Sequence, residues 1–324
     1  MKAFVTGGTG FIGTHLVERL AQAGHEARCL IRKSRDASSL MEANATLVTG
    51  DVTDRASVAA AMEGCDWVFN LANLYSFWEP DKRIFTRVNV DGTRNVLETA
   101  LKLGVSKVVH VTSAVVYGKP KDCPFTETSA AGPVHFSEYA RTKYAGDLIA
   151  WELYEKQGLP LVMIYPGAVL GSGDPKATGH YIEDLVRRRL PATVFPKTVM
   201  TFVHVNDAAT AILMAAEKSG NIGEKYLVGG HRASMRQLNE MVHEISGVPL
   251  PRLSLPSWLT QISAVLMTGL AGLTGKPPLW GMSIDQIATM KEGFAFDGSK
   301  AERELGLSYT PIRQAIEETI ASYR

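Results

Sequence analysis

The chain has 324 residues, enough for one large domain or two smaller ones, and its 45% hydrophobic and 21% charged residues are typical of a globular protein. The 34 Lys and Arg residues nearly balance 33 Asp and Glu residues, which gives a formal net charge of +1. This balance argues against a broad surface for nucleic acid or for an anionic membrane. We therefore expect a small-molecule partner and no nucleic acid.

Cysteine usage and the first residues both bear on the cellular compartment. The three cysteines lack CxxC spacing and lie far apart, at Cys29, Cys65 and Cys123. They predict neither a disulfide framework nor a metal site. Met1 leads directly into a strand pattern, without the basic region, apolar core and cleavage site of a secretion signal. The expectation is a cytoplasmic protein without a bound metal.

Short β-branched runs alternate with longer segments of helical period in the first half of the chain. The helical segments are 11–23, 55–62, 84–103 and 139–157. The strand-like runs are 3–6, 27–31, 47–49, 67–71, 107–112 and 161–165. Such alternation is typical of βαβ units. It predicts an α/β fold, a doubly wound parallel sheet of the Rossmann type with helices on both faces.

The alternation of strand-like and helical segments ends after Pro166. Glycine and proline punctuation precedes a helix at 181–190, an apolar stretch at 198–205, a helix at 206–218 and a strand at 225–228, and the pattern from Ser234 onward is mainly helical. We expect a dinucleotide-binding domain at 1–165, to which 203–230 returns. A smaller, mainly helical substrate domain would then consist of 166–202 and 231–324.

One segment near the C-terminus carries no charge. No charged residue occurs between Arg252 and Lys276, although the segment holds Trp258 and several large aliphatic side chains. Peripheral contact with a membrane is one interpretation. Polar and small residues dilute the run, which is barely long enough to span a bilayer. We therefore expect no integral membrane span, and we favour a buried helix that lines the substrate cavity.

The strand end at Thr6 is followed by a glycine-rich turn, Gly7-Gly8-Thr9-Gly10-Phe11-Ile12-Gly13. Glycine lets the backbone turn tightly and lets a pyrophosphate approach, while the N–H groups at the start of the next helix favour an anion. The position between a strand and a helix is the context that this motif requires. The residues expected at the cofactor are Gly7, Gly10, Phe11, Ile12 and Gly13.

The residues after the second strand bear on the choice of nicotinamide cofactor. Dinucleotide folds normally place an acidic residue there, which binds the ribose 2′-hydroxyl. Here Arg32 ends the strand, Lys33 and Arg35 follow, and the first carboxylate is Asp36. Guanidinium binds phosphate through charge-assisted hydrogen bonds. This favours NADP(H) over NAD(H), with a solvated basic loop as the alternative.

Tyr139 and Lys143 lie four residues apart in a segment of helical period, so their side chains project from the same face. A phenol with a pKa of about 10 is a poor base at neutral pH. A lysine cation beside it favours the phenolate and brings proton transfer within range. The spacing therefore predicts an acid/base pair.

These features occur in one order with Asp51-Val52, the strand end at 70–73, Asn89 and Ser113. Together they resemble the extended short-chain dehydrogenase/reductases, and the resemblance covers essentially the whole chain. It extends to FVHVNDAA at 202–209 and to FDGSKA at 296–301. Tyr165-Pro166-Gly167 is more similar to the dihydroflavonol reductase and 3β-hydroxysteroid dehydrogenase branch than to nucleotide-sugar epimerases, which carry Asn there.

The resemblance implies roles for the matching residues. Tyr139 would be the general acid/base, and Lys143 would lower its pKa and bind the cofactor ribose. Ser113 would hydrogen-bond the substrate oxygen. Asn89 would support a proton-relay water or, alternatively, would be a structural amide in a kinked helix. The further cofactor contacts implied are Asp51 and Val52 at the adenine end, Leu71 and Ala72 along the centre, and Pro166.

Aromatic residues just past the fourth strand would overhang the nicotinamide pocket, because ligands bind beyond the carboxyl ends of parallel strands. They suggest an apolar substrate wall or, alternatively, a loop sealed against the core. The substrate contacts expected are Tyr75, Phe77, Trp78 and Val115. The run 187–189 of three arginines could grip a diphosphate, but a solvated helix end is the favoured interpretation. His204 belongs to the FVHV segment rather than to a metal site.

Three functions remain open at this point. The first is an NADP(H)-dependent oxidoreductase that interconverts a ketone or aldehyde and an alcohol on a fairly apolar small molecule. The second is a nucleotide-sugar epimerase or dehydratase with transient hydride transfer, and the third is a non-enzymatic redox sensor. The tyrosine and lysine pair favours an enzyme. Many members of the resembling family form homodimers through the helices matching 84–103 and 139–157, whereas others are monomers.

Overall fold

The computed structural model describes residues 1–33, 35–132, 134–174 and 176–323. Its larger sheet has seven parallel strands in the order β3-β2-β1-β4-β5-β6-β9. This is the Rossmann order extended by one strand, and it confirms the expected α/β fold. The strands are β1 (Lys2–Thr6), β2 (Glu26–Ile31), β3 (Thr46–Thr49), β4 (Trp67–Asn70), β5 (Lys107–Val111), β6 (Leu161–Pro166) and β9 (Lys225–Val228).

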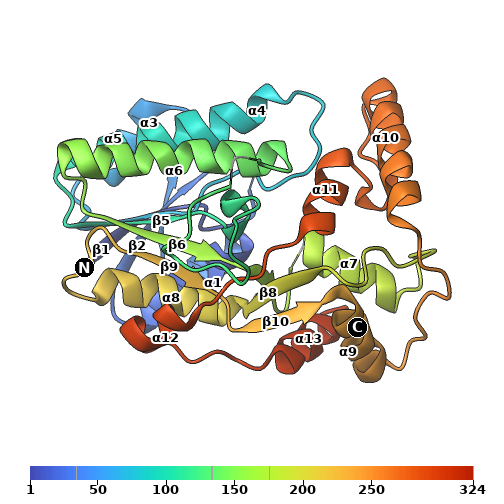
Figure 1. Cartoon of the computed structure of the whole chain (residues 1–324). Helices are drawn as coiled ribbons and strands as arrows, with labels where there is room; N and C mark the ends of the chain where they lie inside the picture. The colour runs from blue at the N-terminus through green and yellow to red at the C-terminus, as the bar shows by residue number, and fades with distance from the viewer. Residues whose placement is uncertain (34, 133, 175, 324) are drawn as a thin grey trace.

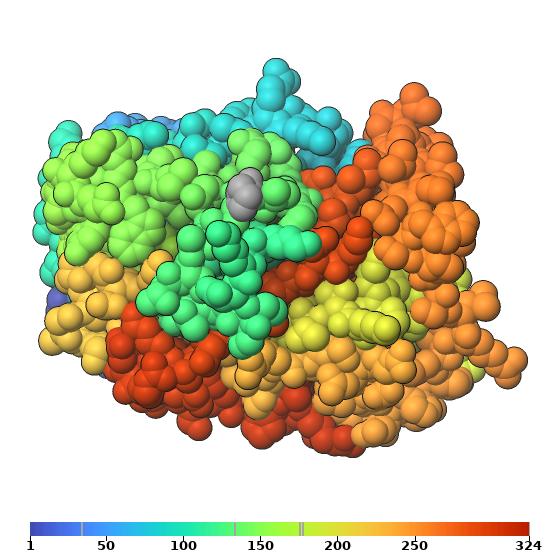
Figure 2. All heavy atoms as spheres, viewed as in Figure 1, coloured from blue at the N-terminus to red at the C-terminus, as the bar shows by residue number. Residues whose placement is uncertain are grey.

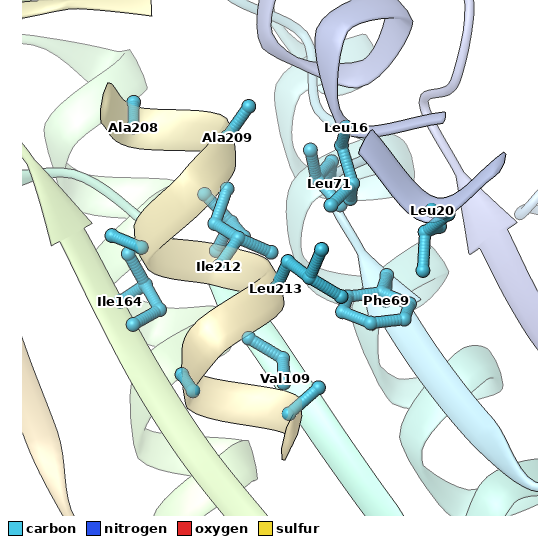
Figure 3. Packing of buried hydrophobic residues seen from close by; sticks show 14 of the residues in the cluster. Leu16, Leu20, Phe69, Leu71, Val109, Ile164, Ala208, Ala209, Ile212 and Leu213 are labelled. Carbon is cyan, nitrogen blue, oxygen red and sulfur yellow. The ribbon is translucent and has the colours of Figure 1, made fainter. Parts of the chain in front are cut away.

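Helices cover both faces of this sheet, as Figure 1 shows. On one face lie α1 (Phe11–Gln22) and α8 (Val205–Glu217), and on the other lie α3 (Arg55–Met62), α5 (Thr93–Leu103) and α6 (Glu138–Gln157). Neighbouring residues of β1 point to opposite faces, so Phe4 and Val5 belong to different buried clusters. Figure 3 shows side chains of α8 packed toward β4, β5 and α1, an arrangement that buries apolar surface on both sides of the strands.

A smaller sheet lies beside the larger one. It has the order β10-β8-β7, with β7 (Ala168–Leu170) parallel to β8 (Val199–His204) and β10 (His231–Ser234) antiparallel. Packed with it are α7 (Ala177–Val186), α9 (Met235–Ser246) and α13 (Ile312–Ala321). The chain returns from β8 through α8 to β9 at the edge of the larger sheet. The apolar stretch expected at 198–205 is therefore mostly strand.

The helix expected at 84–103 is interrupted. It begins as α4 (Arg83–Phe85), continues as a π-helix, η1 (Thr86–Gly92), and becomes regular again at α5. Such π segments are frequent at functional sites. Short elements elsewhere are α2 (Ser38–Glu42), α12 (Ser299–Leu305), and the 3-10 turns η2 (Ala114–Tyr117) and η3 (Leu279–Gly281).

The uncharged C-terminal segment forms α10 (Ser257–Thr274), followed by α11 (Ile284–Glu292). The expectation that this helix is buried and lines the substrate cavity is wrong. Its large apolar side chains are mostly exposed, and none of its described residues lines the main cavity. The physical reason is that α10 uses its small side chains for packing. Within the described ranges, no helix has both the length and the apolarity needed to cross a membrane.

Candidate active site

The glycine turn joins β1 to α1 in a conformation that only glycine accepts readily. Gly7 has a φ of 73°, and a Cβ there would lie 2.8 Å from the Ala72 nitrogen. A Cβ on Gly13 would lie 2.1 Å from the Gly7 oxygen, so the first turn of α1 sits directly on the loop. Gly10 caps α1 without a side-chain hydrogen bond. The free N–H groups at this helix start suit a pyrophosphate.

A cavity of about 470 Å³ begins at this turn and runs past the carboxyl ends of the strands. That is where ligands bind in open α/β sheets. Its lining contains most of the residues expected at the cofactor: Gly7, Gly10, Phe11, Ile12, Gly13, Arg32, Asp51, Val52, Leu71, Ala72, Tyr139 and Pro166. Arg35 lines it as well. Lys143, expected as a ribose ligand, does not line the cavity.

The loop ends that follow β2 and β3 bring Arg32, Arg35 and Asp51 to one part of the cavity. The Asp51 carboxylate accepts hydrogen bonds from the Thr53 N–H at 2.9 Å and from the Thr53 hydroxyl at 2.8 Å. The carboxylate therefore helps to fix the conformation of its own loop. Asp36 does not line the cavity, and its carboxylate accepts from the Ser38 N–H at 3.0 Å. Two guanidinium groups are thus available to an anionic ligand at this end.

Tyr139 stands in the first turn of α6, which the Ser137 hydroxyl caps by accepting from the Ala140 N–H at 3.1 Å. Only 5% of Tyr139 is exposed. Its ring lies edge-on to the rings of Tyr75 and Phe77, with centroid separations of 5.0 and 6.2 Å. The phenol is therefore enclosed by the aromatic segment that follows β4.

Burial raises the pKa of Tyr139 well above its usual range, and the charge of Asp147 raises it further. A hydrogen bond with the Ser113 hydroxyl acts in the opposite direction. The pKa of Tyr139 is therefore raised, whereas the pairing with Lys143 was expected to lower it. The desolvation of the buried phenol has the largest effect on this pKa. At neutral pH the Tyr139 hydroxyl keeps its proton, which suits a proton donor.

Lys143 lies one turn further along α6 and is fully buried. Its ammonium group donates a hydrogen bond to the Val111 carbonyl oxygen at 2.9 Å, at the end of β5. Burial lowers the pKa of Lys143 to about 8, against the opposing effect of Asp147 one turn beyond. Lys143 can therefore gain and lose a proton close to neutral pH.

Asn89 occupies the π-helix η1 and is almost fully buried. Its side-chain oxygen accepts from the Leu74 N–H at 2.7 Å, and its amide donates to the Thr142 hydroxyl at 3.1 Å. A Cβ on Gly146 would lie 2.9 Å from the Asn89 carbonyl oxygen, so α6 passes close to the bulge. The amide thus ties the loop after β4 to α6. Its proton-relay role stays a prediction.

A buried polar network that the sequence did not indicate joins Thr6, Asn70, His110 and Asp147. The Thr6 hydroxyl donates to Asn70 Oδ1 at 2.7 Å, and Asn70 Nδ2 lies 3.0 Å from His110 Nδ1. His110 Nε2 lies 3.7 Å from Asp147 Oδ1. Burial lowers the pKa of His110, despite the opposing effect of Asp147. The spacing of Asp147 four residues after Lys143 was the available signal.

The far end of the cavity is mainly apolar. Tyr75, Phe77 and Val115 line it as expected, and Ser113 lines it beside Tyr139, whereas Trp78 does not contribute to the lining. The smaller sheet and the helices around it supply further walls that were not foreseen: Tyr181, Met200, Phe202, Met235, Leu238, Gln286, Thr289, Met290 and Phe294. They come from separate segments, so no local pattern marks them.

The arginine run and His204 both have local partners within the protein. Arg187 pairs with Glu183 at 2.7 Å, Arg189 lies 3.6 Å from Asp184, and the run 187–189 does not line the cavity. His204 Nδ1 accepts from the Asn206 N–H at 3.1 Å, which caps α8. Across the described ranges, no cluster of three or more His, Cys, Asp or Glu side chains could hold a metal ion.

Residues 3–229 match the family model described as the NAD-dependent epimerase/dehydratase family. The chain belongs to this family. A Synechocystis protein named "Putative dihydroflavonol 4-reductase" is 31% identical over 324 residues, covering 98% of this chain and 93% of its own. "Sterol demethylase protein B" of Methylococcus capsulatus is 31% identical over 329 residues, covering 100% of this chain and 98% of its own. The crystal structure of gox2253 aligns with a TM-score of 0.84 at 33% identity, covering 99% and 97% of the two chains.

Membership confirms the resemblance to the extended short-chain dehydrogenase/reductases and makes the protein an NAD(P)-dependent enzyme. The glycine turn fits such a cofactor, because a Cβ at Gly7 or Gly13 would collide with the backbone that forms it. The roles of Ser113, Tyr139, Lys143 and Asn89 stay predictions, as do the cofactor preference and the substrate.

Proposed function

We propose that this enzyme is an NADP(H)-dependent oxidoreductase that interconverts a ketone or aldehyde and an alcohol on a fairly apolar small molecule. One observation carries the proposal: the Ser113 and Tyr139 hydroxyls line the same cavity as an apolar chamber that includes Phe202 and Met290. A substrate carbonyl between these hydroxyls would place the rest of its molecule against apolar walls. Such walls favour an apolar substrate through the area that they remove from water.

The NADP(H) preference rests on Arg32 and Arg35, which line the cavity where β2 ends. Two guanidinium groups can bind a 2′-phosphate through charge-assisted hydrogen bonds. Asp51 lies at the same end, but its carboxylate already accepts two hydrogen bonds from Thr53. Asp51 also follows β3, whereas the acid that binds a ribose diol in NAD(H) enzymes normally follows the second strand.

Bound NADPH would supply the hydride that reduces the carbonyl carbon. The Tyr139 hydroxyl then donates its proton to the carbonyl oxygen as that oxygen gains negative charge, and the Ser113 hydroxyl stabilises the same oxygen through a hydrogen bond. The raised pKa of Tyr139 keeps this proton in place before the reaction. In this proposal Lys143, one turn further along α6 and with a pKa of about 8, would stabilise the phenolate left behind through its positive charge.

A nucleotide-sugar epimerase is the second candidate, because the matching family model takes its name from such enzymes. A substrate diphosphate requires cationic groups that neutralise its charge. Beyond residue 166, Lys176 is the single cation among the described residues that line the cavity. The arginines at 187 and 189 are already paired with carboxylates outside it. These contacts favour the oxidoreductase.

The test is NADPH oxidation, followed by nicotinamide absorbance, with a panel of aldehydes, aromatic ketones and steroid ketones, and with NADH in parallel. The proposal predicts net oxidation that depends on the ketone and is faster with NADPH. Calorimetric binding of UDP-glucose without net oxidation in the panel would instead support the epimerase.

A further inference from the structure

The exposed face of α10 carries a group of large apolar side chains. Trp258 and Leu266 are each 63% exposed, and Leu273 is 88% exposed. Four more exposed apolar side chains lie on this helix or shortly before it: Leu253, Ile262, Val265 and Leu270. Figure 1 shows α10 projecting away from both sheets, and in Figure 2 the same orange segment forms a protrusion. We call the seven residues 253, 258, 262, 265, 266, 270 and 273 the α10 face.

On α10 the small side chains are buried and most of the large apolar side chains are exposed. Its buried positions are the small residues Thr260, Ala264 and Ala271. Ala264 packs in a cluster with Ile287 of α11. A surface helix normally turns its large apolar side chains toward the core. Here they point outward, and an exposed apolar patch of this kind marks an interaction site.

Several polar side chains of α10 form hydrogen bonds within the protein. The hydroxyls of Thr260 and Thr274 donate to carbonyl oxygens one turn earlier in the chain. The Gln261 amide donates to the Ser257 carbonyl oxygen, and the Thr268 hydroxyl accepts from the Ile284 N–H. Protein interfaces carry about one hydrogen bond per 100–200 Å². In a hydrocarbon environment, by contrast, polar groups must form their hydrogen bonds within the protein.

The charges and aromatic residues around this helix indicate which apolar environment it meets. No acidic residue occurs from 245 to 284, whereas Arg252 and Lys276 flank the helix. Exposed tryptophans stand near both ends, at Trp258 and Trp280. Tryptophan is enriched at membrane interfaces, and cations attract anionic headgroups. This arrangement is complementary to an anionic lipid surface.

We propose that the α10 face inserts into one leaflet of an anionic lipid bilayer and holds the enzyme on that surface. The helix does not span the bilayer, because its inner face packs on α11. Gln286, Thr289 and Met290 of α11 line the main cavity. Insertion would therefore bring the apolar chamber close to molecules dissolved in the membrane.

The experiment is sedimentation of the full chain with phosphatidylcholine vesicles that contain or lack phosphatidylglycerol. The wild-type protein should bind the anionic vesicles, and Leu266→Glu should weaken binding about tenfold or more, because a charge replaces an inserted apolar side chain. Met41→Glu is the matched control, since Met41 is 59% exposed on α2 and outside the α10 face. It should leave binding unchanged.

Absence of binding to anionic vesicles would overturn the proposal, as would equal binding by Leu266→Glu. Equal binding with and without phosphatidylglycerol would refute the role given to Arg252 and Lys276. Light scattering without lipid provides a further check. A stable dimer that Leu266→Glu dissociates would assign the α10 face to a second copy of the chain. These assays contain no cofactor or substrate, so their failure is distinct from failure of the proposed reductase.

Discussion

The ionisation of Lys143 should set the alkaline limit of the proposed reaction. Its pKa of about 8 lies below the usual 10.5, so the ammonium form present below pH 8 is lost as the pH rises. About 90% of Lys143 is protonated at pH 7 and about 10% at pH 9. If the cation stabilises the Tyr139 phenolate as proposed, kcat/KM should fall about tenfold between these pH values. A value of kcat/KM that stays constant to pH 10 would refute this reasoning.

Asp147→Asn provides the directed perturbation of the same group. The Asp147 carboxylate lies one turn beyond Lys143 and favours its ammonium form. Removing its charge should therefore shift the alkaline limb of the kcat/KM profile to lower pH. Glu152→Gln is the control, because Glu152 is on the same helix but pairs with Lys156 in a solvent-exposed position. A limb that moves equally in both variants would contradict the assignment to Asp147.

Three further predictions test the cofactor site and the loop after β4. Arg32→Ala should raise KM for NADPH about tenfold or more with little change for NADH, because charge-assisted hydrogen bonds to the 2′-phosphate are lost. Gly13→Ala should weaken NADPH binding, measured by fluorescence, by on the order of tenfold or more, because the new Cβ would lie 2.1 Å from the Gly7 oxygen. Asn89→Ala should lower the free energy of unfolding in urea by about 1–3 kcal/mol, since it leaves the Leu74 N–H without its side-chain partner.

The larger sheet was predictable because its signals are local. Buried parallel strands give short β-branched runs, and the limits at 55–62 and 225–228 match α3 and β9. The sequence offered the interruption at η1 only as one of two interpretations of Asn89, a structural amide in a kinked helix. The interruption depends on the contacts of Asn89 with Leu74 and Thr142, which are distant in the sequence.

The candidate site was predictable where a motif is contiguous and much less so elsewhere. The turn at 7–13 lies at the cavity as expected, and Tyr139 and Ser113 come together there. The sequence did not reveal that burial raises the pKa of Tyr139, because burial is a property of the folded chain. The placement of α10 was wrong, since hydropathy alone does not reveal which face of a helix packs.

The most direct test of the central claim is the turnover of Tyr139→Phe with the best ketone of the panel and NADPH, together with a fluorescence titration of NADPH binding. The variant lacks the proton donor but keeps the ring that packs against Tyr75 and Phe77. Loss of the proton donor should lower kcat about a hundredfold or more and leave NADPH binding nearly unchanged. Turnover close to that of the wild-type enzyme would contradict this prediction.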